Sequence, residues 1–219
     1  INRRATLAES ATNQPVTAGL NLCYGSAGAI YGTYLDSPGT RDWLVRAPDD
    51  SFMAPILKVD EHNLIAVTYN GYIWSLNGTN GVANWPLRKV NGTVVAKPAA
   101  SADQKLLVIV AGDKKAYAFN NNNGNELWNA RLDGELTRQP VIANGMVLAV
   151  GDGKGLYALD AASGIQKWFT GGVTQILSVG ESEIIAADKH GSLVRINPAD
   201  GTITASSRVN DADQFLAAN

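Results

Sequence analysis

The sequence predicts an all-β fold made of four-stranded antiparallel units that repeat about every 40 residues. Three observations carry this prediction: turn glycines recur at a nearly constant spacing, an aromatic residue follows most of them, and short apolar strands precede each one. The turn glycines are Gly39, Gly81, Gly124, Gly164 and Gly201, separated by 42, 43, 40 and 37 residues. Four strands in each such unit is the composition of a blade, so the fold class is a β-propeller with five repeats.

The clearest copy of the unit lies between Gly155 and Trp168. Tyr157 and Leu159 alternate with small residues, which is typical of a half-buried strand. The stretch Asp160–Gly164 favours a tight turn, because an Asp side chain accepts hydrogen bonds from turn amides and Gly adopts a positive φ at low cost. The tryptophan then falls on the outgoing strand, four residues after the glycine.

The other copies follow the same order with some departures. Trp43, Trp85 and Trp128 each lie four residues after their turn glycine, whereas Ala205 occupies that position after Gly201. Because the tryptophans recur at one position of the repeat, we expect them to be structural side chains buried between adjacent blades rather than a platform for a ligand. Trp74 lies at a strand position held elsewhere by Tyr or Val, and we expect it to belong to the core.

Two further strands are expected upstream of each turn. The first is led by a proline in most units, namely Pro15, Pro55, Pro98 and Pro140, with Ile176 in the equivalent place of the last unit. The second strands are Leu20–Tyr24, Leu64–Thr68, Leu106–Val110, Met146–Val150 and Glu183–Ala187. We therefore predict a single domain over residues 1–219, with blades at approximately 14–46, 52–90, 93–132, 136–171 and 173–209.

The two ends of the chain each resemble one additional strand. Arg3–Glu9 occupies the place of the outer strand of a preceding blade, and Gln214–Ala217 resembles the inner strand that begins at Gln175. The repeats are therefore compatible with a closed five-bladed ring or with an arc of a larger propeller. We favour the closed ring, because an open arc would expose two blade faces. Since the chain begins at Ile1, we expect a processed product or a fragment.

The turn segment resembles a known family motif. Ala158-x-Asp160-x-x-Ser163-Gly164-x-x-x-Trp168 is similar to the tryptophan-docking motif Ala-x-Asp-x-x-Thr-Gly-x-x-x-Trp of PQQ-like, or quinoprotein-type, propeller repeats. Asn120, Asn77 and Asn197 stand in the Asp position of three other copies, and Leu35 stands there in the first copy. The residues of the structural repeat motif are Gly39, Trp43, Gly81, Trp85, Gly124, Trp128, Gly164, Trp168 and Gly201.

Composition excludes several classes of partner. The chain of 219 residues has a net charge of −2, so no basic field for nucleic acid is expected. No apolar run approaches the ~20 residues of a membrane-spanning helix. Cys23 is the sole cysteine, which rules out an intrachain disulfide, and its apolar neighbours indicate a buried side chain.

The sequence contains no set of residues with the spacing of a catalytic, phosphate-binding or metal-binding site. His62 and His190 are the only histidines, and both are expected in surface turns without the spacing of metal ligands. The glycine-rich stretch Gly151–Gly155 joins two strands, so we interpret it as a hairpin turn rather than a phosphate-binding loop. No nucleophile-elbow pattern occurs, and most acidic residues fall in turns. We therefore predict no catalytic, cofactor-binding or metal-binding residues and no cofactor.

The resemblance implies a choice between functions. Quinone-dependent alcohol dehydrogenases of this fold use an adjacent cysteine pair beside the quinone, which a chain with a single cysteine lacks. The leading hypothesis is a non-catalytic scaffold, similar to the BamB-like outer-membrane assembly lipoproteins, which binds other proteins or peptides through a propeller face. The alternatives are a fragment or relative of a PQQ-dependent dehydrogenase and a small-ligand or sugar-binding propeller. The resemblance implies a periplasmic or extracellular location, with any lipid anchor lying outside this chain.

Overall fold

The computed structural model describes residues 11–36 and 41–208. Within these ranges the chain forms five antiparallel sheets and no helix, which confirms the all-β prediction. Blade 1 comprises β1 (Val16–Ala18), β2 (Asn21–Tyr34) and β3 (Arg41–Ser51). Blade 2 comprises β4 (Leu57–Asp60), β5 (Asn63–Val67), β6 (Tyr72–Leu76) and β7 (Arg88–Lys89). No helix in the described part of the chain is long and apolar enough to cross a membrane.

The remaining three blades each have four strands. Blade 3 comprises β8 (Ala99–Ala100), β9 (Leu106–Ala111), β10 (Lys115–Asn120) and β11 (Glu126–Arg131). Blade 4 comprises β12 (Val141–Ala143), β13 (Met146–Gly151), β14 (Gly155–Asp160) and β15 (Gln166–Gly171). Blade 5 comprises β16 (Val173–Val179), β17 (Ile184–Asp188), β18 (Ser192–Ile196) and β19 (Ile203–Arg208). In blades 2 to 5 the strands pair in chain order, as a meander. The residue limits that we predicted for each blade from the sequence stay a prediction, because the structure defines strands and not the ends of the repeat units.

Blade 1 reaches the same architecture with one strand fewer, because β2 doubles back on itself. The amide of Leu35 donates to the carbonyl oxygen of Leu20 at 2.8 Å, although the two residues flank the two ends of β2. The Thr33 hydroxyl likewise donates to the Leu22 carbonyl oxygen at 3.5 Å. The bend contains Gly28 at φ +87°, a conformation that glycine adopts without strain. The two halves of β2 therefore occupy the second and third strand positions.

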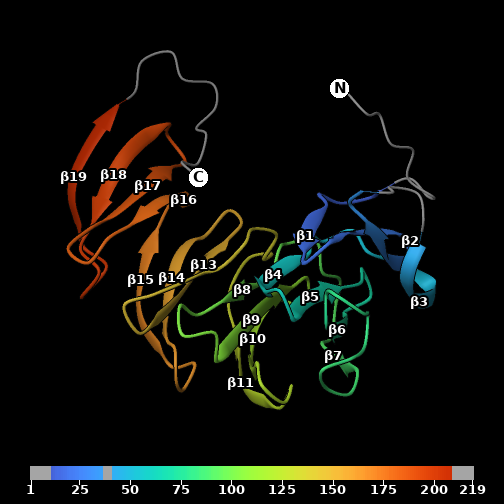
Figure 1. Cartoon of the computed structure of the whole chain (residues 1–219). Coiled ribbons are helices and arrows are strands. Elements are labelled where there is room, and N and C mark those ends of the chain that lie inside the picture. The colour runs from blue at the N-terminus through green and yellow to red at the C-terminus, as the bar shows by residue number, and fades with distance from the viewer. Residues whose placement is uncertain (1–10, 37–40, 209–219) are drawn as a thin grey trace, which may run out of the picture.

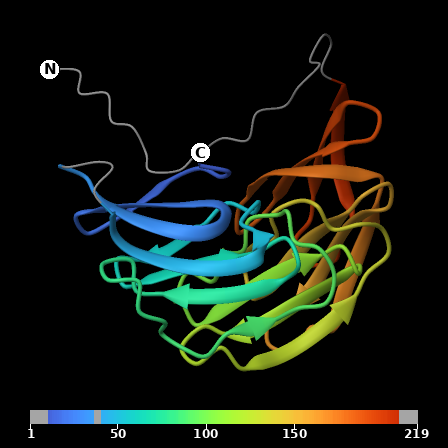
Figure 2. The ribbon, with the colours of Figure 1, turned by 90° about the vertical axis from the view of Figure 1, so that its right-hand side faces the viewer.

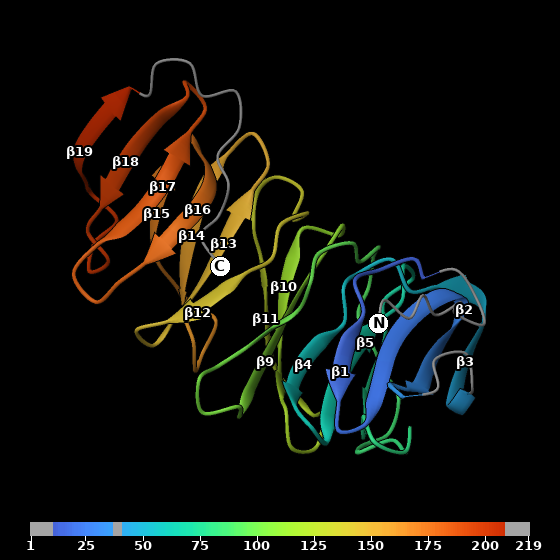
Figure 3. The ribbon, with the colours of Figure 1, turned by 45° about the horizontal axis from the view of Figure 1, so that its top comes forward.

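The five blades follow one another along an arc in chain order (Figure 1). The first strand of each blade lies toward the inside of the arc and the last strand toward the outside (Figure 1). Blade 1 and blade 5 lie apart at the two ends of this arc (Figures 1 and 3), and Figure 2 shows the ribbon from the side of blade 1. The described residues thus take the arc arrangement and not the closed ring that we favoured. The extra strands expected at Arg3–Glu9 and Gln214–Ala217 lie outside the described residues.

The apolar core lies between neighbouring blades. In blade 2, Leu64 and Ala66 pack toward blade 1, whereas Ile65 and Val67 pack toward blade 3. This division follows from strand geometry, because successive side chains point to opposite faces of a sheet. Near-continuous apolar strands are therefore required, which explains why the second and third strands of each blade lack the polar alternation of a one-sided sheet.

Candidate functional site

A repeated turn lies on one face of the arc and connects the third and fourth strands of blades 2 to 5. In four blades the amide of the turn glycine donates to the carbonyl oxygen of the Asp or Asn four residues earlier. These pairs are Gly81 with Asn77 at 2.7 Å, Gly124 with Asn120 at 2.8 Å, Gly164 with Asp160 at 2.8 Å and Gly201 with Asn197 at 2.9 Å. The side chain of the Asp or Asn closes the turn further. The Asp160 carboxylate, for example, accepts from the Ser163 amide at 3.0 Å and the Ser163 hydroxyl at 2.9 Å.

Each tryptophan after such a turn contacts the next blade. Its indole N–H donates to a backbone carbonyl oxygen in the corresponding turn of that blade. The pairs are Trp43 with Gly78 at 3.2 Å, Trp85 with Asn121 at 3.1 Å, Trp128 with Ala161 at 3.0 Å and Trp168 with Pro198 at 2.8 Å. All four side chains are buried. A buried indole and its N–H hydrogen bond thus recur between every pair of neighbouring blades in the described arc.

The turn glycines make room for these rings. A Cβ atom placed on Gly81, Gly124, Gly164 or Gly201 would lie 2.5 to 2.7 Å from the indole of the preceding blade. The same four glycines have φ between +69° and +75°, which side chains rarely adopt. Glycine is therefore required at this position for two reasons: the turn needs a positive φ, and the indole of the preceding blade leaves no room for a Cβ atom. Gly39, the first predicted member of the motif, lies outside the described residues.

The remaining side chains of sequence interest are spread apart. Trp74 is half-buried, and its ring centroid lies 5.4 Å from that of Phe52. His62 and His190 are exposed in turns, each with its backbone amide bonded to an Asp two residues earlier. The stretch Gly151–Gly155 joins β13 to β14. Burial raises the pKa of the Cys23 thiol to about 12.

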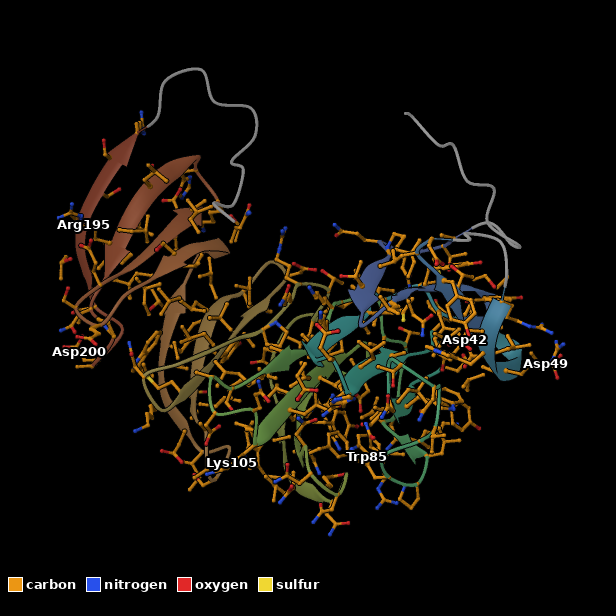
Figure 4. The ribbon with its side chains drawn as sticks, viewed as in Figure 1. Asp42, Asp49, Trp85, Lys105, Arg195 and Asp200 are labelled. Atoms are coloured by element: carbon orange, nitrogen blue, oxygen red, sulfur yellow. The ribbon has the colours of Figure 1, made fainter. Side chains whose placement is uncertain are left out.

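Charged residues do not gather at one point of the arc. Asp42 and Asp49 belong to blade 1, whereas Arg195 and Asp200 belong to blade 5 at the opposite end (Figure 4). In the described residues, no group of three or more His, Cys, Asp or Glu side chains is placed to hold a metal ion.

An apolar groove opens on the turn face between blades 3 and 4. It has a volume of about 580 Å³. Its apolar wall includes Leu106, Leu127, Ile142 and Ala162. Lys105 and Asp103 lie on its rim, with their charged groups 3.7 Å apart. We call this feature the turn-face groove. It presents an apolar floor with a polar edge, an arrangement that suits a protein or peptide partner.

The groove residues were not among the site residues predicted from the sequence, although Leu127 is an unusual residue for its position in the repeat. Leu127 immediately precedes the tryptophan of its blade, and its side chain is 53% exposed. The residues at the same position of the other blades are polar: Asp42, Asn84 and Lys167. A leucine at a position that otherwise faces solvent marks a local change in the surface of blade 3.

A second hollow lies on the inner side of the arc, between β12 of blade 4 and β16 of blade 5. Its volume is about 710 Å³. Val141, Ile142, Ile176 and Val179 line it together with the polar side chains of Arg138 and Gln175. The sequence predicted these strands as the inner strands of their blades.

Comparison with known proteins places the chain in a family. The model of the family described as outer membrane protein assembly factor BamB matches residues 88–215, which covers more than half of the chain. The chain belongs to this family. No curated protein matches the sequence significantly.

Solved structures show the same fold at low identity. BamB from Moraxella catarrhalis is 17% identical with a TM-score of 0.55, covering 93% of this chain and 78% of its own. The computationally designed Ika8 protein is 13% identical with a TM-score of 0.72, covering 95% of this chain and 66% of its own. Quinohemoprotein alcohol dehydrogenase from Comamonas testosteroni is 11% identical with a TM-score of 0.67, covering 91% of this chain and 43% of its own. The PQQ-like propeller repeats expected from the sequence are confirmed.

Proposed function

We propose that the protein is a non-catalytic scaffold that binds other proteins during the assembly of outer-membrane proteins, and that the turn-face groove is its contact site. The observation that carries this proposal is Leu127, an exposed leucine on the groove wall at a position where other blades have polar residues. The family match supports the assembly role, since it covers blades 3 and 4, which form the groove.

The chemistry of the groove suits a peptide segment rather than a reactive small molecule. Its wall is formed by aliphatic side chains from the strands and turns of two blades. Burying an exposed leucine on association contributes roughly 1.5 to 3 kcal/mol, so one or two such residues can carry much of the binding energy of a modest interface. The Asp103 and Lys105 side chains at the rim supply orientation through charge.

A quinone-dependent dehydrogenase is the alternative function, and the likeness to a quinohemoprotein alcohol dehydrogenase favours it through the fold alone. Quinone-dependent alcohol dehydrogenases of this fold hold the quinone beside an adjacent cysteine pair, whereas this chain has one cysteine. That thiol is buried and accounted for by packing beside Ile30 and Trp43. The scaffold function therefore agrees better with the residues, and the periplasm is its proposed location.

Complementation tests the scaffold function. The protein would be produced in the periplasm of a bacterium that lacks its own BamB, and the amount of folded outer-membrane protein would be measured. We expect the wild-type chain to restore assembly and Leu127→Glu to fail. Leu87→Glu is the matched control, because Leu87 is similarly exposed, at 48%, but lies outside the groove. Equal restoration by both variants would remove the groove from the function, and no restoration by wild type would contradict the assembly role.

A further inference from the structure

The chain contains six Asn–Gly pairs, at residues 70–71, 77–78, 80–81, 91–92, 123–124 and 144–145. In such a pair the backbone nitrogen of the glycine can attack the side-chain amide carbon of the asparagine, because glycine has no side chain to hinder the approach. The attack closes a small ring, so the asparagine side chain and the glycine nitrogen must both be free to turn toward each other. Hydrogen bonds that hold either group therefore oppose the reaction.

In three of these pairs the glycine nitrogen is held in a turn. The Gly71 amide donates to the Thr68 carbonyl oxygen at 3.0 Å. The Gly81 and Gly124 amides donate to carbonyl oxygens within the repeated turns, at 2.7 and 2.8 Å. An amide that donates a hydrogen bond keeps its proton and its orientation, so these three nitrogens are poor nucleophiles.

In two further pairs the asparagine side chain is held instead. The Asn77 side-chain oxygen accepts from the Thr79 amide at 2.9 Å and from the Thr79 hydroxyl at 2.7 Å. The Asn144 side-chain nitrogen donates to the Gly180 carbonyl oxygen of blade 5 at 2.8 Å. These bonds must break before either side chain can turn toward its glycine.

Asn91 and Gly92 have neither restraint. Among the described residues, no hydrogen bond joins the Asn91 side chain or the Gly92 amide to another group. Both residues are exposed in the loop between β7 and β8. Asn91 lines a polar recess of about 500 Å³ together with Asn70 and Lys89, so water reaches the pair. Asn70 is also exposed and shares this recess, which makes it the matched comparison within the chain.

We propose that Asn91 is a site of spontaneous deamidation in the folded protein. The Gly92 nitrogen loses its proton and forms a bond to the side-chain carbonyl carbon of Asn91, and ammonia leaves from that carbon. Water then opens the succinimide ring at either carbonyl group, which gives aspartate or isoaspartate at this position. Either product adds a negative charge to a chain whose net charge is −2. The modification is independent of the turn-face groove, because Asn91 does not line it.

The isoaspartate product lengthens the backbone at a point that is anchored on both sides. The Val90 amide donates to the Gly71 carbonyl oxygen at 2.9 Å, and the Val94 amide donates to the Tyr69 carbonyl oxygen at 2.9 Å. An added methylene group between these anchors strains the link between blade 2 and blade 3. We therefore expect the isoaspartate form to melt at a lower temperature than a form that gains only the charge.

Incubation of the folded full chain at mildly alkaline pH, followed by peptide mapping with mass spectrometry, tests the proposal. The tryptic peptide Val90–Lys105 contains only this Asn–Gly pair. We expect Asn91 to convert roughly tenfold faster than Asn70, because the Gly71 amide must first break a hydrogen bond of ordinary strength. In the urea-unfolded chain the two sites should convert at similar rates. Asn91→Gln should abolish the fast modification, because its longer side chain closes a ring slowly.

Asn91→Asp is the matched variant for the effect on stability, since it adds the same charge without lengthening the backbone. The isoaspartate form, separated by chromatography, should melt below this variant, and equal melting temperatures would overturn the strain at the link. Two outcomes would overturn the deamidation site itself. The first is a folded chain in which Asn70 or another Asn–Gly pair converts as fast as Asn91. The second is an Asn91 that stays intact in the folded chain but converts in the unfolded chain.

Discussion

The indole ring of Trp168 lies directly against Gly201 of the next blade, so closely that a Cβ on that glycine would be 2.5 Å from a ring carbon. The same relation joins Trp43 to Gly81, Trp85 to Gly124 and Trp128 to Gly164. A contact at this distance cannot be relieved by a side-chain rotation, because the ring is itself fixed by its N–H bond to the Pro198 carbonyl oxygen. The spacing between blades is thus set by a glycine and an indole.

Gly201→Ala is expected to destabilise the protein by about 2 to 4 kcal/mol, which combines about 1 kcal/mol for a side chain at positive φ with overpacking against Trp168. The chain offers a matched control in Gly191, whose φ is also +75° but which has open space where the Cβ would go. Gly191→Ala should therefore lower the free energy of unfolding only by the contribution of a side chain at positive φ, about 1 kcal/mol. Urea unfolding of the two variants measures the difference, and equal losses would mean that the ring contact contributes nothing.

Trp128→Ala and Trp168→Ala are each expected to lower the free energy of unfolding by about 3 to 5 kcal/mol, as for other buried aromatic residues, and Trp85→Ala should behave similarly. Trp168→Phe separates the ring from its hydrogen bond, because it keeps an aromatic side chain and removes the N–H donor. It should cost less than Trp168→Ala, although it leaves the Pro198 carbonyl oxygen without its donor. Unchanged melting temperatures for all of these variants would rule out a structural role for the tryptophans.

The elements that could be predicted from the sequence are those determined by local chemistry. The turn at Asp160–Gly164 and the tryptophan at position 168 follow from residue types within one short segment, and the repeat multiplies that evidence. The predicted inner and second strands of blades 2 to 5 were also visible as short apolar runs. The second strand expected at Leu20–Tyr24 falls in the first half of β2, and the chain reverses near Gly28.

The arrangement of the blades depended on contacts between distant segments, which a repeat pattern does not contain. We favoured a closed ring because an arc exposes two faces, yet the described chain is an arc. A physical reason was present at Ala205: without a tryptophan, blade 5 has no indole to bury against a further blade. The turn-face groove was missed because it forms between two blades. Comparing the residue before each tryptophan would have identified Leu127.

The single cysteine leads to a prediction about cofactors. We expect the purified protein to bind no pyrroloquinoline quinone and to need no Ca²⁺, since Cys23 is buried with a raised pKa and has no second cysteine beside it. Titration with the quinone and Ca²⁺, followed by absorbance, checks this expectation. Saturable binding at micromolar concentration together with alcohol oxidation would overturn the scaffold function.

The turn of blade 4 predicts a dependence of stability on pH. Hydrogen bonds from the Ser163 hydroxyl and amide lower the pKa of Asp160, with Lys167 contributing from 3.4 Å. Because the pKa is lower in the folded state than in the unfolded chain, the ionised carboxylate stabilises the fold at neutral pH. That stabilisation is lost as the pH falls from about 4, the ordinary pKa of Asp, through the lowered folded value.

Asp160→Asn provides the test, because asparagine keeps the acceptor oxygen and already serves at the same position of blade 3, as Asn120. The wild type should be more stable than the variant at pH 7, and the difference should shrink as the pH is lowered below about 4, where the wild-type carboxyl becomes protonated. Asp200→Asn is a companion variant, since hydrogen bonds from Thr202 lower the pKa of Asp200 in the turn of blade 5. Thermal melts across this pH range measure both effects. A wild-type advantage that stayed constant, or grew, on acidification would show that the Asp160 carboxylate does not stabilise the turn through its charge.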